Sequence, residues 1–172
     1  MSPKELKKAA EKAALFLHTE AVDILATEGQ KHFANSFQSG VEGFTDKQLK
    51  KWPDLKESTK KQKRRKNGSL PPILTNSGHL GDSINYNQDY NKQAVVFSSP
   101  GYGQIHNEGG TISGTQHVKS HTRTVNANTQ HVKSHTRTVN FSIPQREFMG
   151  ESEVLDNTVI DLIEKHLDSI FK

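Results

Sequence analysis

The sequence contains no cysteine, which excludes disulfides, thiol nucleophiles and cysteine-based zinc or iron–sulfur sites. Hydrophobic residues make up only 31% of the 172 residues and aromatic residues 7%, so the core should be modest and the solvated surface large. No segment holds the roughly 18 apolar residues that a membrane-spanning helix needs, and the charged N-terminus is unlike a secretory signal. We therefore expect a single domain over residues 1–172 with no membrane contact.

Charge is unevenly distributed along the chain, although the net charge is only +4. Residues 60–66 contain six positive charges and no negative one, whereas residues 146–172 contain seven acids and three bases. Basic surfaces of one copy could meet acidic surfaces of another in a repeating assembly; alternatively, both are ordinary solvated faces. The basic run supplies the first candidate contacts for a partner or DNA: Lys60, Lys61, Lys63, Arg64, Arg65 and Lys66.

Apolar residues spaced by three and four predict a helix at each end of the chain. Gly29 is where the N-terminal helix, residues 3–37, could break, because glycine costs about 1 kcal/mol relative to alanine inside a helix. Residues 151–171 should form an amphipathic C-terminal helix with its acids in solvent. The predicted N-terminal stripe comprises Leu6, Ala10, Ala13, Leu17, Ala21, Ile24 and Leu25, extended by Phe33 and Phe37.

Short elements are expected between these helices, and together they predict an α+β fold with a small antiparallel sheet. Trp52, the only tryptophan, should anchor the core or staple a loop. The other expectations are a loop at 38–53, a short helix at 54–66 capped by Ser58 or Thr59, a turn-and-helix segment at 73–83, strands at 84–88 and 94–98, and a short strand or turn at 102–106.

The strongest internal signal is the segment TQHVKSHTRTVN, which occupies residues 115–126 and recurs unchanged at 129–140. Threonine and valine at alternate positions favour strands, and the residues between the copies suit a turn. The repeat therefore predicts one long antiparallel hairpin within a basic insertion at 112–142. Each arm of twelve residues would extend about 40 Å.

A turn centred on residue 127 would pair odd-numbered residues with odd-numbered ones, so one face would carry every basic or titratable side chain of the repeat. Neither face would be apolar, so the hairpin should project from the body. Repulsion between like charges would favour an acidic or polyanionic partner. These side chains are the remaining candidate contacts: His117, Lys119, His121, Arg123, His131, Lys133, His135 and Arg137.

Histidine is the only abundant residue type suited to catalysis. His117 and His121 are four residues apart, a spacing that could bind zinc on a helix but spans about 13 Å on a strand. There is no HExxH motif, phosphate loop, serine elbow or carboxylate pair. His106 is expected to bind local backbone rather than to form half of an acid–base pair. We therefore predict no catalytic residue, no metal and no cofactor.

Four short motifs follow one another between residues 52 and 150. They are WPDL at 52–55 with Ser58-Thr59, ILTNSGHL at 73–80 with Ser83-Ile84, YGQIHNEGG at 102–110, and IPQREFMG at 143–150. In this order they resemble motifs of the phage virion morphogenesis (tail completion) proteins of Mu-like and P2-like contractile-tailed phages. Gln145 and Glu147 stand where that family usually has alanine and proline.

The resemblance covers roughly residues 50–172 and implies a non-enzymatic protein of tail completion or head–tail joining. It further implies small α+β subunits that form a homo-oligomeric ring and contact other tail or neck proteins. Such a protein would lie in the bacterial cytoplasm during assembly and afterwards in the virion. Two alternatives stay open: a nucleic-acid-binding module that uses residues 60–66 and 115–140, and a metal-dependent hydrolase that uses the repeated histidines.

Overall fold

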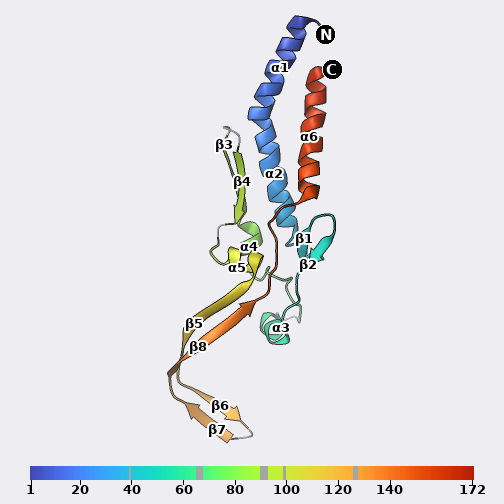
Figure 1. Cartoon of the computed structure of the whole chain (residues 1–172). Coiled ribbons are helices and arrows are strands. Elements are labelled where there is room, and N and C mark those ends of the chain that lie inside the picture. Colours follow the sequence, from blue (N-terminus) through green and yellow to red (C-terminus); the bar gives the residue numbers. More distant parts are fainter. Residues whose placement is uncertain (39, 65–67, 90–92, 99, 126–127) are drawn as a thin grey trace.

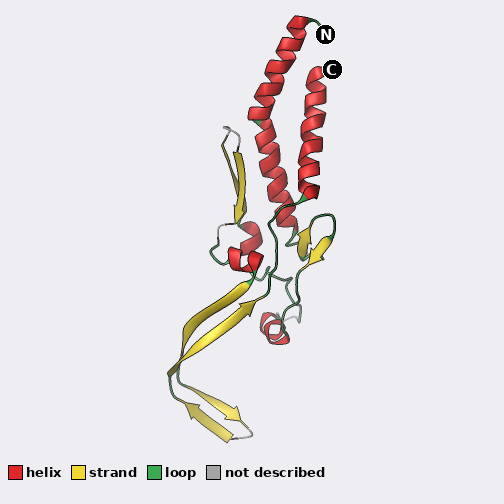
Figure 2. Cartoon of the chain, viewed as in Figure 1, coloured by secondary structure: helices red, strands yellow, loops and turns green. Residues whose placement is uncertain are grey.

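The computed structural model describes the chain except for residues 39, 65–67, 90–92, 99 and 126–127. It is an elongated α+β molecule, which confirms the predicted fold class (Figure 1). Long helices form one end, a two-stranded ribbon projects at the other, and short helices and strands lie between them (Figure 2). The two ends of the chain lie together at the helical end.

The helical end consists of α1 (Pro3–His18), α2 (Glu20–Asn35) and α6 (Glu153–Phe171), with α6 beside the other two. The break in the N-terminal helix falls at Thr19, with φ −124° and ψ −81°, and not at Gly29. Gly29 has a different role inside α2, because a Cβ there would lie 3.0 Å from Cγ2 of Val96. Glycine therefore lets the neighbouring strand approach this helix closely.

The buried stripe of α1 and α2 is rotated from the predicted one. Leu6, Leu17 and Leu25 are exposed, which corrects the prediction for these positions. Phe16 is buried instead, and its ring stacks on that of His166 with centroids 3.9 Å apart. The face that carries Phe16 is therefore the one that α6 covers. The buried residues of the two helices are Ala9, Ala13, Phe16, Ala21, Val22, Ala26, Gly29 and Phe33.

The middle of the molecule contains a hairpin that the sequence did not predict. Strands β1 (Gly43–Thr45) and β2 (Leu49–Lys51) pair where a loop was expected. The pairing is close at Gly43, where a Cβ would lie 2.4 Å from the carbonyl oxygen of Lys50. Phe44 is fully buried there, and the Gly43 N–H donates to the Ser36 carbonyl, so a core side chain and backbone bonding together hold this short hairpin on the body.

The remaining short elements match the predictions in two cases and differ in two. Strands β3 (Ile84–Asp89) and β4 (Gln93–Ser98) pair antiparallel, and α4 spans His79–Asp82, both as predicted. Helix α3 (Glu57–Lys63) begins at Lys56 without a side-chain cap, so neither Ser58 nor Thr59 caps it. Residues 103–106 belong to a helix, α5 (Gly103–Glu108), with Tyr102 as its N-cap, because the Pro100 carbonyl accepts the Gly103 N–H and Gly109 ends the helix with φ 74°.

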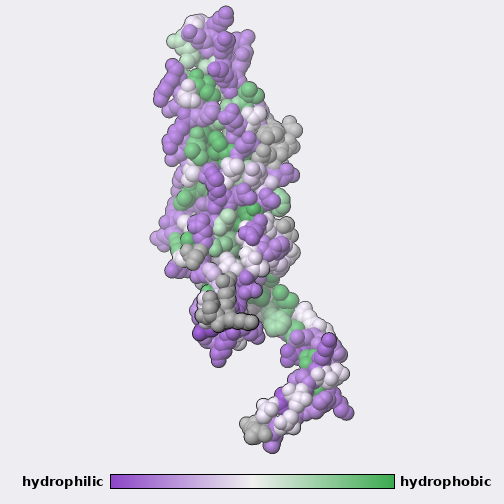
Figure 3. Space-filling view, turned by 180° about the vertical axis from the view of Figure 1, so that it is seen from behind, coloured by the Kyte–Doolittle hydropathy of each residue, from purple (hydrophilic) through white to green (hydrophobic). Residues whose placement is uncertain are grey.

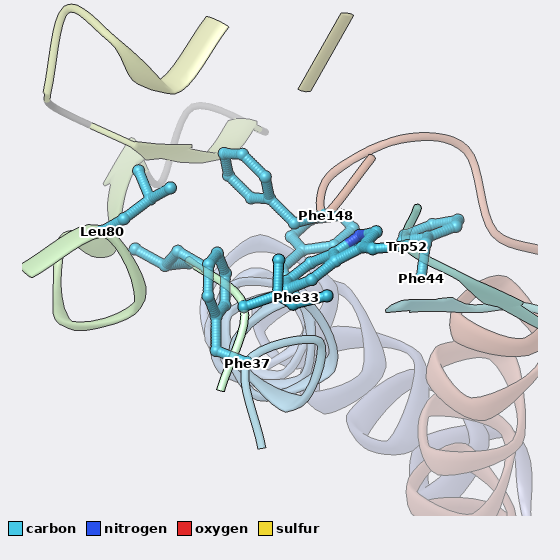
Figure 4. Close-up of a cluster of buried hydrophobic side chains, with 8 residues drawn as sticks. Phe33, Phe37, Phe44, Trp52, Leu80 and Phe148 are labelled. Carbon is cyan, nitrogen blue, oxygen red and sulfur yellow. The ribbon is translucent and has the colours of Figure 1, made fainter. Parts of the chain in front are cut away.

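The hydrophobic core lies where α2 meets the short elements (Figure 4). Phe37 packs against Trp52 and Phe148, with ring centroids 5.3 and 5.1 Å away. The indole of Trp52 donates a hydrogen bond to the carbonyl of Glu147, which confirms tryptophan as a core anchor. The cluster comprises Phe33, Phe37, Phe44, Trp52, Ile73, Leu80, Ile84 and Phe148.

The projecting ribbon is a hairpin made of two ladders, β5 (Gly110–Val118) with β8 (His135–Ile143) and β6 (His121–Val125) with β7 (Asn128–Val132). Odd-numbered residues pair with even-numbered ones, so the predicted register is wrong by one residue. The reason is a two-residue connection between β6 and β7, whereas the prediction centred the turn on one residue. The predicted turn residues 126 and 127 lie outside the described part of the chain.

The two ladders repeat the same residue pairs. Gln116 faces Arg137 near the body, and its copy Gln130 faces Arg123 near the tip. The ladders are separated where Lys119-Ser120 lies across from the second Lys-Ser pair, and Figure 1 shows the ribbon bending there. The two copies of the repeat can therefore pair with each other in antiparallel orientation. This pairing forms two ladders that contain the same residue pairs. These pairs are Thr–Thr, Gln–Arg, His–Thr and Val–His.

Deletion of residues 121–134 should remove one ladder and leave the body folded. The deletion joins Ser120 to His135, keeps every pair of the body-proximal ladder and uses Lys119-Ser120 as the two-residue connection. Because the removed residues contact little besides each other, we expect the free energy of unfolding to change by less than about 1 kcal/mol. Chemical denaturation followed by circular dichroism measures this. A larger loss would show that the distal ladder supports the core.

Candidate partner-binding site

The candidate contacts from the sequence lie in two separate places. The cations and histidines of the repeat are on the ribbon, and Lys60, Lys61, Lys63 and Arg64 lie on or directly after α3, near the root of the ribbon. Arg65 and Lys66 lie outside the described residues. Among the residues that the structure describes, no hydrogen bond or ion pair joins the two groups. The structure therefore presents two basic surfaces rather than one.

The ribbon carries cations on both of its faces, because the register differs from the predicted one. His117 lies opposite Thr136, whereas Arg137 lies opposite Gln116 on the other face. Arg137 donates to Oε1 of Gln116 from Nε at 3.2 Å and from Nη2 at 2.9 Å. The basic side chains of the two ladders therefore face glutamine, threonine or valine across the strands and never another basic residue, so the arrangement avoids the predicted repulsion within the hairpin.

The repeated Lys-Ser-His step makes the same local contact in both copies. The Nδ1 atom of His121 lies 3.0 Å from the carbonyl oxygen of Lys119, and that of His135 lies 3.0 Å from the carbonyl oxygen of Lys133. Each histidine side chain thus contacts the backbone two residues earlier in the chain, beside the bend. These two histidines are bound locally, whereas the lysine side chains next to them are exposed.

The basic run on α3 is only partly free to bind a partner. Lys60 forms ion pairs with Asp54 at 2.6 Å and with Glu57 at 3.0 Å. The hydrogen bond that Lys60 donates to Asp54 is the main cause that raises the pKa of Lys60, and its hydrogen bond to Glu57 adds to this. Lys61 is exposed, so it stays available. Lys60 is neutralised within the chain and is a weaker candidate than the sequence suggested.

A third basic cluster, which the sequence did not single out, lies at the root of the ribbon. Arg146 is only 6% exposed and donates from Nε to the carbonyl of Pro53 at 3.1 Å. His106 accepts the Arg146 N–H at its own carbonyl, 2.7 Å away. Burial lowers the pKa of the His106 imidazole, and Arg146 and Lys63 lower it further. Two cations and a neutral histidine therefore converge here from three different parts of the chain.

Asn107 fixes this cluster in place and is the residue whose role the sequence missed. Its Oδ1 accepts the N–H groups of Phe148 at 2.8 Å and Met149 at 3.0 Å, and its Nδ2 donates to the Met149 carbonyl at 2.9 Å. One amide side chain thus joins the third sequence motif to the fourth. The order of the motifs indicated that both segments matter, but only the fold shows that they touch.

No metal centre is formed among the residues that the structure describes, where no group of three or more histidines and acids is placed to hold an ion. His117 and His121 belong to different ladders, on either side of the bend. Within the same described ranges, no helix is long and apolar enough to cross a membrane. What the arrangement offers is a set of basic surfaces and a mainly apolar cavity that Arg146 helps to line.

Replacement of Asn107 by alanine should destabilise the protein by about 1–3 kcal/mol, because two part-buried backbone N–H groups lose their acceptor. Urea denaturation measures the loss. The matched control is Gln104→Ala on the same helix, whose side chain binds only the exposed Glu108 and should cost less than about 0.5 kcal/mol. Equal effects for the two variants would contradict the role given to Asn107.

The stability of the protein should fall as the pH is lowered. Burial lowers the pKa of both His106 and His32 in the folded chain, although Asp46 partly opposes this at His32. Below about pH 6.5 the unfolded chain therefore takes up protons that the folded chain does not, and unfolding becomes easier. Denaturation at several pH values measures the slope. The double variant His32→Gln/His106→Gln should flatten it, and an unchanged slope would refute the assignment.

A protein-family model described as the phage virion morphogenesis family matches residues 4–168. The match includes the N-terminal helices as well as the four motifs. A search of curated proteins and a search of solved structures gave no match.

Proposed function

The chain belongs to the phage virion morphogenesis family, and we propose that it acts without catalysis in tail completion or head–tail joining, as one subunit of a ring. The family match over nearly the whole chain is the observation that carries this proposal. We propose further that residues 1–172 form a single tail-completion-like domain in which 112–142 is a basic hairpin insertion. The protein would work in the host cytoplasm during assembly and remain in the tail or neck.

The shape and the charges of the molecule support a structural role. The ribbon has no acidic residue between 110 and 143, whereas α6 at the far end carries five acids. A subunit with a basic ribbon and an acidic last helix can bind its neighbour head to tail, and such contacts close into rings when the rotation permits. Partners in the finished particle would be other tail or neck proteins.

Contact with DNA is a second candidate function, and the exposed ribbon is what favours it. Its cations lie on both faces and are bound by no acid of the ribbon itself. Neutralising phosphates with lysine and arginine gives binding that weakens steeply with salt. The candidate residues for either partner are the described ones: Lys60, Lys61, Lys63, Arg64, His117, Lys119, His121, Arg123, His131, Lys133, His135 and Arg137.

A variant with an uncharged ribbon tests the proposal in the assembling phage. Its particles should join heads to tails at least about tenfold less often, because four exposed charges contribute a few tenths to one kcal/mol each. Electron microscopy and plaque counts measure this, and circular dichroism verifies the fold. The substitutions are Lys119→Gln, Arg123→Gln, Lys133→Gln and Arg137→Gln.

The matched control removes four exposed charges from α1 and should assemble as the original protein does. Normal assembly by the ribbon variant would contradict a role for these side chains, and normal tails without the protein would contradict the proposed function. A gel shift at low salt that disappears in the ribbon variant alone would favour DNA as the partner. The control substitutions are Lys4→Gln, Lys7→Gln, Lys8→Gln and Lys12→Gln.

A further inference from the structure

A cavity of about 680 Å³ lies at the root of the ribbon, between α3, α5 and the end of β8. Its lining is mainly apolar, and Figure 3 shows hydrophobic surface where the ribbon leaves the body. Phe141 in this lining is 54% exposed, which is unusual for a large aromatic side chain with nothing to cover it. The apolar lining includes Leu55, Leu74, Leu80, Tyr102, Phe141 and Ile143.

The described lining of the same cavity holds several basic groups and one acid, Asp54, whose charge acts on Arg146. Lys63 forms no ion pair within the described part of the chain, and its pKa is lowered by burial and by Arg146. His106 has a buried Nδ1 without a hydrogen-bond partner. The carboxylate of Asp54 binds Lys60 as well. An apolar group accompanied by a carboxylate would therefore fit the walls and relieve the repulsion between these cations.

Helix α6 exposes an apolar side chain that has carboxylates beside it. Ile160 is 50% exposed on the outer face of the helix. Asp156 and Glu164 lie four residues before and after it, which places them on the same stripe. Neither acid forms an ion pair with a described residue. Ile160 is thus an apolar side chain flanked by two free carboxylates.

We infer that Ile160, with Asp156 and Glu164, docks into the root cavity of a second copy of this chain. The two surfaces cannot meet within one molecule, because α6 extends from the middle of the body away from the ribbon (Figure 1). The cavity and α6 therefore bind different neighbours, so each copy uses both surfaces at once and the contact repeats from subunit to subunit. This inference rests on the proposed function, in which identical subunits assemble.

Charge reversal on either surface tests the contact in the full-length protein. Lys63→Glu places an acid in the cavity, and Glu164→Lys places a base on α6, so each variant alone should weaken self-association about tenfold or more. The double variant restores opposite charges and should regain assembly. Lys61→Glu is the matched control, because Lys61 is exposed on the same helix and does not line the cavity. Sedimentation velocity measures the assembly, and circular dichroism verifies the fold.

Loss of assembly in both single variants, with recovery in the double variant, would support the contact. Assembly that survives both single changes, or that the double variant fails to recover, would overturn it. An original protein that stays monomeric at every concentration would also overturn it, since the partner would then be another virion protein. A role in tail completion survives each of these results if the protein still completes tails, although a monomer would also contradict the proposed ring, so the failure of the contact and the failure of that role can be told apart.

Discussion

The packing of Phe148 is the interaction on which the rest of the structure depends. This side chain is 1% exposed and lies against Phe37, just after the end of α2, while the side chain of Asn107 in α5 accepts its backbone N–H. The segment that carries Phe148 joins the end of the ribbon to the start of α6. One buried ring therefore fixes the direction in which the ribbon leaves and the position at which the last helix begins. The basic cluster at the root depends on it as well, because Arg146 is held two residues earlier.

The ribbon, in contrast, depends on the body only through its root. Its described residues are exposed apart from three valines and Ile143, which are half-buried, and the same residue pairs stabilise both of its ladders. A duplicated, self-complementary segment can thus lengthen the projection without any change in the core. A two-stranded ribbon is only marginally stable alone in water. A longer ribbon is therefore useful where a neighbouring surface stabilises it. The core therefore maintains the fold, whereas the ribbon determines how far the molecule extends from its body.

The sequence predicted the elements whose signal is local and missed those that depend on contacts. The strands at 84–88 and 94–98, the last helix and Trp52 as a core anchor all follow from spacing or residue type. The hairpin of β1 and β2 depends on one glycine, on the buried Phe44 and on a hydrogen bond between Asp46 and the distant Ser152, which no pattern of three residues reveals. The stripe on α1 was misplaced because alanine and leucine occur on several faces, and only the position of α6 selects the one with Phe16. Asn107 could not be identified because its three partners lie more than forty residues away.

The register of the ribbon decides what kind of neighbour it can bind. With the predicted register, one face would hold all of the basic side chains of the repeat. Such a face could bind along a single polyanion. The observed register places the first copy's His117 and the second copy's Arg137 on opposite faces. A ribbon that is basic on both faces is suited to lie between two acidic surfaces, because each face can then be neutralised separately. In a ring of identical subunits a projecting element has a neighbour on either side, so the shift of one residue favours a protein partner over a single strand of DNA.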